Sequence, residues 1–177
     1  MNMKKLHKDQ RGLTIIELLV VIILTGLITT AITTTFFQVF DMNTRTANHM
    51  AALSQVQQAG KLVSEDILEA QEDMIDASPS GEVFLVLGWT AQNGTVHAVN
   101  YTLEDMPPGE FKILWREHYI DSNLDSTTKV AEYIDPDPTK TSCDWDDVKK
   151  VLTFKVTVTV GEQTEQRTYR VQPRPGL

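Results

Sequence analysis

The chain begins with a long stretch that is almost free of charge. Between Leu13 and Phe40 the only charged residue is Glu17. At about 1.5 Å per residue, a helix of this length crosses a hydrocarbon layer of roughly 30 Å. We therefore predict that residues 13–40 form a transmembrane helix. The segment Thr29–Thr35 is rich in β-branched hydroxyl residues, which lower helix propensity, so we expect a soft point there.

A second periodic pattern continues from this stretch. Apolar or small residues recur at alternating spacings of three and four, which is typical of one face of an amphipathic helix. No Pro or Gly cluster interrupts the pattern before Ser78–Gly81, so we predict that residues 41–78 extend the same helix outside the membrane. His49 lies on this face, and we expect it to bond to a neighbouring strand. The face comprises Val39, Met42, Thr46, His49, Leu53, Val56, Gly60, Val63, Ile67, Ala70 and Met74.

After Gly81 the period of the pattern changes from 3.6 to 2. Residues 82–91 and 95–103 flank Asn93-Gly94, a strong hairpin signal, and residues 110–120 follow the turn at 106–109. These segments predict a three-stranded meander.

Two further strands are predicted near the C-terminus. Apolar and polar residues alternate through residues 151–160, so one face is buried and the other is wet. Residues 164–171 are more polar and predict a last strand at an edge. We therefore expect an α+β fold in which residues 81–177 form an antiparallel sheet covered by the amphipathic half of the helix.

Composition narrows the class of protein. The chain has 177 residues, 41% of them hydrophobic, which suits one globular domain plus an appendage. Residues 1–12 carry a local charge of +3, and the remainder has 12 basic and 23 acidic residues. A body with this excess of acidic residues is poorly suited to neutralising the phosphates of nucleic acids. We therefore expect no nucleic-acid partner. Cys143 is the only cysteine and cannot form an intramolecular disulfide; we interpret it as a buried or half-buried thiol.

The flanking charges predict an orientation. Basic residues precede the apolar stretch and Asp41 follows it, so the positive-inside rule places the N-terminus in the cytoplasm and the body outside. We predict a single-pass protein of the cytoplasmic membrane with a periplasmic or extracellular domain. The alternative is a secretory signal peptide that is cut after the small residues Thr29 and Ala31.

Gly12–Val21, "GLTIIELLVV", carries a specific resemblance. Together with the short basic leader, it resembles the signal of type IV pilins and type II secretion pseudopilins. The resemblance implies that a prepilin peptidase removes residues 1–12 by cutting between Gly12 and Leu13, and that the new amine of Leu13 is methylated. Glu17 then stands at the fifth mature position, while Leu13 replaces the more common Phe.

The resemblance gives Glu17 a role and implies a pilin-like fold. Cutting creates a cation at Leu13 in the same membrane layer as the carboxylate of Glu17. We hypothesise that the two charges neutralise each other between adjacent subunits, because an isolated charge at low dielectric is costly. The apolar helices would then bundle as the core of a filament.

Three departures from the common pattern suggest a minor subunit. The apolar segment lacks the helix-bending Pro, the pair of C-terminal cysteines is missing, and the sheet region is longer than in small major pseudopilins. Leu53–Gln71 is similar to the extramembrane helix of J-type minor pseudopilins and W-type minor pilins. The implied partners are other pilins or pseudopilins in a filament or tip complex, the prepilin peptidase, the inner-membrane assembly platform and membrane lipid.

One acidic segment is a candidate calcium loop. Asp121, Asn123, Asp125 and Glu132 occupy the first, third, fifth and twelfth positions of an EF-hand spacing. Ser126 stands where that loop needs Gly, and the flanks resemble strands, so an ordinary turn is the alternative. The acidic residues in 135–138 and 143–147 leave room for a different calcium geometry.

Motifs for catalysis are absent from the sequence. It contains no nucleophile elbow, phosphate-binding Gly loop or Cys-His cluster, so we predict no enzyme and no resident cofactor. Three functions remain open at this point: a structural filament subunit, a membrane-anchored extracellular ligand-binding module that does not polymerise, and a secreted enzyme. The mature N-terminus would distinguish them.

Overall fold

The computed structural model describes residues 14–77 and 82–174, and it divides into two compact units, residues 1–44 and 45–177. The helix α1 runs from Ile15 to Glu69 and belongs to both units. We describe each unit by itself and call the described part of the second unit the body.

In the first unit, the described residues form an uninterrupted apolar helix. Hydroxyl groups of the threonines donate hydrogen bonds to carbonyls three or four residues earlier, as Thr29 Oγ1 does to the carbonyl of Thr25 at 2.8 Å. These bonds satisfy the hydroxyls inside the helix, so the predicted soft point contains no break. Among the described residues, α1 is the helix that is long and apolar enough to cross a membrane.

The body combines the C-terminal part of α1 with one antiparallel sheet. After α1 come a 3₁₀ turn and eight strands. Their bounds in the described residues are η1 Glu72–Met74, β1 Ile75–Asp76, β2 Val83–Thr90, β3 Val96–Met106, β4 Phe111–Ile120, β5 Asn123–Ile134, β6 Ser142–Asp146, β7 Val151–Val160 and β8 Gln163–Val171. The expected α+β class with a long N-terminal helix is confirmed.

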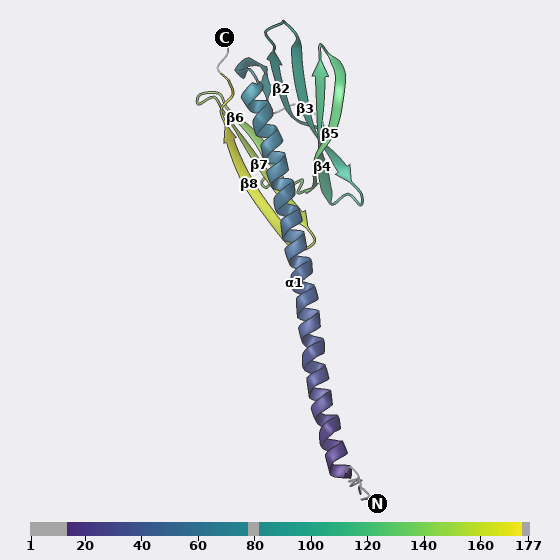
Figure 1. Ribbon diagram of the computed structural model, residues 1–177. Helices are drawn as coiled ribbons and strands as arrows, with labels where there is room; N and C mark the ends of the chain where they lie inside the picture. The colour runs from purple at the N-terminus through teal and green to yellow at the C-terminus, as the bar shows by residue number, and fades with distance from the viewer. Residues whose placement is uncertain (1–13, 78–81, 175–177) are drawn as a thin grey trace, which may run out of the picture. The chain divides into compact units, whose positions relative to one another are not determined.

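The sheet consists of two arms that join at one point. The first arm has the order β1-β2-β3-β4-β5, and in the second arm β6 and β8 lie on opposite sides of β7. Only Ile134 of β5 pairs in register with Val158 of β7. Within the body, α1 lies between β2–β5 on one side and β6–β8 on the other (Figure 1).

The core forms where α1 packs against both arms. Small and branched residues of the predicted apolar face, such as Val56, Val63 and Ile67, are fully buried. They pack in one cluster with Leu87 of β2 and Phe154 of β7. Burial of this kind stabilises the fold by about 25 cal/mol for each Å² of apolar surface. The predicted bond of His49 is also present, because its Nδ1 lies 3.0 Å from Glu165 Oε1 on β8.

The helix ends at Glu69, before the predicted limit at residue 78. The backbone N–H of Gln71 donates a hydrogen bond to the carbonyl of Gly88 at 2.8 Å, and Ile75 pairs with Leu87. Pairing with β2 therefore replaces the last helical turns, although the apolar spacing continues to Met74. Tertiary contacts with β2 therefore decide the conformation of these residues, although their local pattern favours a helix.

Besides β1, which lies inside the segment predicted as helix, two strands were missing from the sequence prediction. Residues 123–134 form β5, and residues 142–146 form β6. Both are rich in polar residues and lack a clear alternation, so their pairing with neighbouring strands decides their conformation. The predicted strands correspond to β2, β3, β4, β7 and β8, and in the described residues β8 pairs only with β7, as expected for an edge.

Candidate processing and assembly site

The described chain begins at the residue that caps α1. Thr14 Oγ1 accepts a hydrogen bond from the backbone N–H of Glu17 at 3.3 Å, and the carbonyl of Thr14 accepts one from Leu18. Thr14 is thus an N-cap and Glu17 is the third helical residue, which is the sequence spacing of a capping box. The Thr-x-x-Glu spacing was a readable signal that the sequence analysis missed.

Glu17 has a second physical reason to stand at this position. A carboxylate in the first turn of a helix interacts favourably with the positive end of the helix dipole. In the described part of the chain no basic side chain lies within ion-pair distance of its carboxylate. The predicted partner, the amine of Leu13 in an adjacent subunit, therefore remains a prediction.

Gly12 and Leu13 lie outside the described residues. Their predicted cleavage and methylation are not addressed by the structure.

The surface around Glu17 is strongly apolar. Ile15 is 87% exposed, Ile16 is 75% exposed and Leu18 is 54% exposed in the single chain. Large apolar residues continue along the helix in the same exposed state as far as Phe40. Such a contiguous apolar surface marks a membrane or protein interface.

The four candidate calcium residues are not brought together. Asp121 and Ser122 form a two-residue turn with positive φ values of 48° and 67°, and Asn123, Asp125 and Glu132 lie along β5. Asp125 Oδ2 is 3.2 Å from His118 Nδ1, and Glu132 Oε1 accepts from Lys129 Nζ at 2.7 Å. The alternative of an ordinary turn describes this segment.

In the other acidic segments, lysine side chains form ion pairs with the aspartates. Lys140 Nζ lies 2.7 Å from Asp135, and Lys149 Nζ lies 2.7 Å from Asp146. The hydrogen bond from Lys149 lowers the pKa of Asp146. Among residues 14–77 and 82–174, no group of three or more His, Cys, Asp or Glu side chains is arranged to hold a metal ion. Calcium binding stays a prediction, which calorimetric titration of the full chain with calcium chloride would test.

A buried polar cluster fixes α1 against the first arm. Asp66 Oδ2 accepts hydrogen bonds from Tyr101 Oη at 2.5 Å and from Arg116 Nε at 2.7 Å, and Asp66 Oδ1 accepts from Arg116 Nη2 at 2.8 Å. Burial, and then the nearby carboxylate of Asp66, raise the pKa of Tyr101 well above its usual value. The partners are 35 and 50 residues apart in the sequence, so no local spacing indicated them.

Comparison with known proteins adds one finding. Residues 7–33 match a family described as the prokaryotic N-terminal methylation motif. No curated protein and no solved structure matches the chain. The matched motif supports a type IV pilin-like or pseudopilin-like substrate of the prepilin peptidase, a class of structural subunits. With the apolar helix α1, it is consistent with a single-pass, membrane-anchored protein.

Proposed function

We propose that the chain is a minor structural subunit of a type II secretion pseudopilus or a type IV pilus-like filament. The observation that carries this proposal is the placement of Glu17 in the first turn of an exposed apolar helix, inside the methylation motif. The prepilin peptidase would hydrolyse the bond between Gly12 and Leu13, leaving a free amine on Leu13. That amine would be methylated and remain a cation.

The exposed helix then explains how the subunit moves from lipid to filament. Its apolar side chains are covered by lipid before assembly and by the helices of other subunits afterwards, so little apolar surface meets water in either state. The carboxylate of Glu17 meets the amine of Leu13 on the neighbouring subunit, which neutralises both charges and fixes the register of the helices. The assembly platform of the inner membrane would supply the site of insertion.

A scarce, priming or capping role is supported by the sequence departures. The first unit has no proline between residues 14 and 44, and the body has one cysteine in place of a pair. A helix without proline and a large sheet suit a subunit at the end of a filament, where it contacts other minor subunits.

The test is the chemical identity of the mature N-terminus. Mass spectrometry of the protein from native membranes is expected to find N-methyl-Leu13 as the first residue. A retained Met1 would contradict the proposal and support a membrane-anchored binding module. A start near Ile32 would instead indicate ordinary signal cleavage.

A further inference from the structure

A groove runs along one flank of α1 in the body. Leu62, Glu65 and Glu69 of α1 form one wall, and the first arm forms the floor and the opposite wall. The groove has a volume of about 530 Å³. Its first-arm residues are Trp89, His97, Arg116, His118 and Thr128.

The rim of this groove is anionic. At the inner wall Asp66 and Arg116 neutralise each other. Glu65 and Glu69 are exposed; the nearest cation to Glu65 is Lys61 at 3.8 Å, a solvent-exposed pair of little strength. Among the described residues the carboxylate of Glu69 has no ion pair, although Arg174 lines an adjoining hollow together with it. Two carboxylates are therefore available to a cationic partner.

The floor of the groove offers flat rings and one acceptor nitrogen. The rings of Trp89 and His97 are nearly parallel, with centroids 5.2 Å apart. His118 Nδ1 lies 3.2 Å from Asp125 Oδ2, and His118 Nε2 lies 3.2 Å from His97 Nδ1. A carboxylate only accepts, so with neutral rings His118 donates to Asp125 and accepts from His97. This order leaves Nε2 of His97 as an acceptor.

These features fit an arginine side chain. A guanidinium group is planar, stacks on aromatic rings and donates several hydrogen bonds in a fixed fork. The ring of Trp89 lines the groove next to the nearly parallel rings of His97 and His118, and this ring cluster supplies the stacking surface. The carboxylates of Glu65 and Glu69 and Nε2 of His97 supply the acceptors. A lysine ammonium would pair with the carboxylates, but it is not planar and would not stack on the aromatic rings in the same way.

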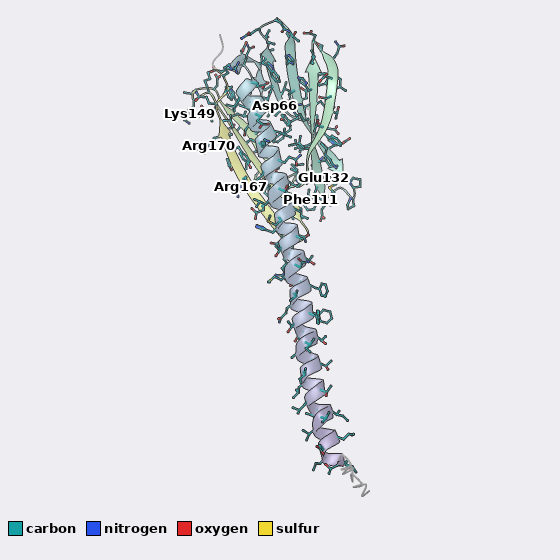
Figure 2. The ribbon with its side chains drawn as sticks, viewed as in Figure 1. Asp66, Phe111, Glu132, Lys149, Arg167 and Arg170 are labelled. Carbon is teal, nitrogen blue, oxygen red and sulfur yellow. The ribbon has the colours of Figure 1, made fainter. Side chains whose placement is uncertain are left out.

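The opposite flank of α1 presents such arginines. On β8, Arg167 and Arg170 are exposed, and neither has a carboxylate partner among the described residues. Arg167 pairs with Val156 and Arg170 with Thr153, so the two side chains lie on the two faces of the edge strand. This strand meets α1 through Tyr169, whose Oη donates to the carbonyl of Val56 at 3.2 Å. Figure 2 shows both arginines on the side of α1 away from β2–β5.

We propose that the groove of one copy binds the Arg167 and Arg170 edge of a second copy of this chain. The two surfaces lie on opposite flanks of α1 and carry opposite charge, so the contact between two copies is heterologous. The inference rests on the proposed function, because it supplies a contact between subunits outside the membrane.

A charge exchange tests this contact in the full chain in detergent micelles. The groove variant is Glu65→Arg/Glu69→Arg, and the edge variant is Arg167→Glu/Arg170→Glu. A photoreactive p-benzoylphenylalanine replaces Thr128, which lines the groove, in every sample. The chain with its native charges is expected to give cross-linked dimers. In these dimers the peptide that is joined to position 128 should come from residues 163–171 of the other copy.

Each variant alone is expected to lose cross-linking by about tenfold or more, because like charges then face each other. An equal mixture of the two variants should recover the dimer, since each groove again meets an edge of opposite charge. Lys112→Glu/Lys149→Glu is the control; it makes the same change in net charge as the edge variant, and neither lysine lines the groove or lies on β8. Its dimer yield should stay close to that of the parent.

The inference is overturned if the mixture fails to recover the dimer, if the cross-links map outside β8, or if Thr128 captures a different protein instead of a second copy. The N-terminus of the same material is sequenced in parallel. N-methyl-Leu13 without recovery overturns the groove contact alone, whereas recovery with a retained Met1 overturns the proposed function alone.

Discussion

Asp66 on α1 and Arg116 on β4 form a two-pronged ion pair inside the body. Both oxygens of the carboxylate accept hydrogen bonds from the guanidinium, at 2.7 and 2.8 Å. The side chains are 10% and 18% exposed, so the pair is shielded from water. Because Tyr101 on β3 also donates to Asp66, one helical residue is fixed to two strands. This contact sets how α1 sits on the first arm.

Arg116→Met is expected to destabilise the body strongly. The substitution leaves the carboxylate of Asp66 buried without its cation, and breaking a buried pair in this way costs about 3–5 kcal/mol. The free energy of unfolding, measured by urea denaturation of the full chain in micelles, would report the loss.

The triple variant Asp66→Leu/Arg116→Met/Tyr101→Phe is the control for this prediction, because the buried hydroxyl of Tyr101 would otherwise lose its acceptor. It removes both charges, so it should recover much of the stability, because apolar replacements of a buried pair are often neutral or stabilising. A single variant as stable as the parent would show that the pair contributes nothing to the fold.

Gly60→Ala is expected to disturb the packing of β8 on α1. A Cβ at Gly60 would overlap the ring of Tyr169, and that ring lies between the helix and β7. Overpacking of this kind costs typically about 1–3 kcal/mol. The measurement is the unfolding midpoint of the body, followed by tyrosine and tryptophan fluorescence.

Gly26→Ala provides the matched control for Gly60→Ala. Apart from its chain neighbours and the backbone of its own helix turn, no atom of the described residues lies within 4 Å of a Cβ built at Gly26, so the same substitution there should leave the unfolding midpoint of the body unchanged. Equal effects at both glycines would assign the loss to something other than contact with Tyr169.

The thiol of Cys143 is expected to link stability to alkaline pH. Burial, and then the charge of Asp144, raise the pKa of this thiol from 9.0 to about 12. Between these values the folded protein keeps the proton while the unfolded chain releases it, so stability falls as the pH rises from 9 to 12. Unfolding titrations across this range would measure the slope, and Cys143→Ser is expected to reduce it. The slope that remains above pH 10 belongs to Tyr101, because burial also raises the pKa of that phenol. The thiol should also react slowly with iodoacetamide at pH 8 unless the body unfolds.

The sequence indicated the elements whose pattern depends on the chain itself. The 3.6-residue period predicted the buried side of α1, and the period of 2 predicted strands such as β7, because burial of one face forces those periods. The hairpin at Asn93-Gly94 followed from local chemistry, since Gly94 has a φ of +85°.

The remaining features depend on partners far along the chain. Helix α1 stops at Glu69 because Gln71 bonds to Gly88, and the polar strand β5 forms because β4 pairs with it. The Asp66–Arg116 pair and the ring cluster at Trp89 likewise join residues from different strands and α1. For the candidate site, the motif at Gly12 and Glu17 was readable because it is contiguous, whereas the groove was not.

Glu17→Ala is expected to block assembly while leaving processing intact. The cut and the methylation act at Gly12 and Leu13, so the variant should still yield N-methyl-Leu13 in the membrane. Its helix would enter the filament without an anion for the amine of its neighbour, and an uncompensated buried charge costs several kcal/mol. Glu17→Asp keeps the charge on a shorter side chain and should retain part of the assembly. The measurement is the fraction of each variant that is recovered in sheared filaments relative to the membrane pool. Thr14→Ala is the control, because it weakens the helix cap by about 1 kcal/mol but keeps the carboxylate of Glu17. Incorporation of Glu17→Ala at the level of the parent would contradict the pairing of this carboxylate with the new N-terminus.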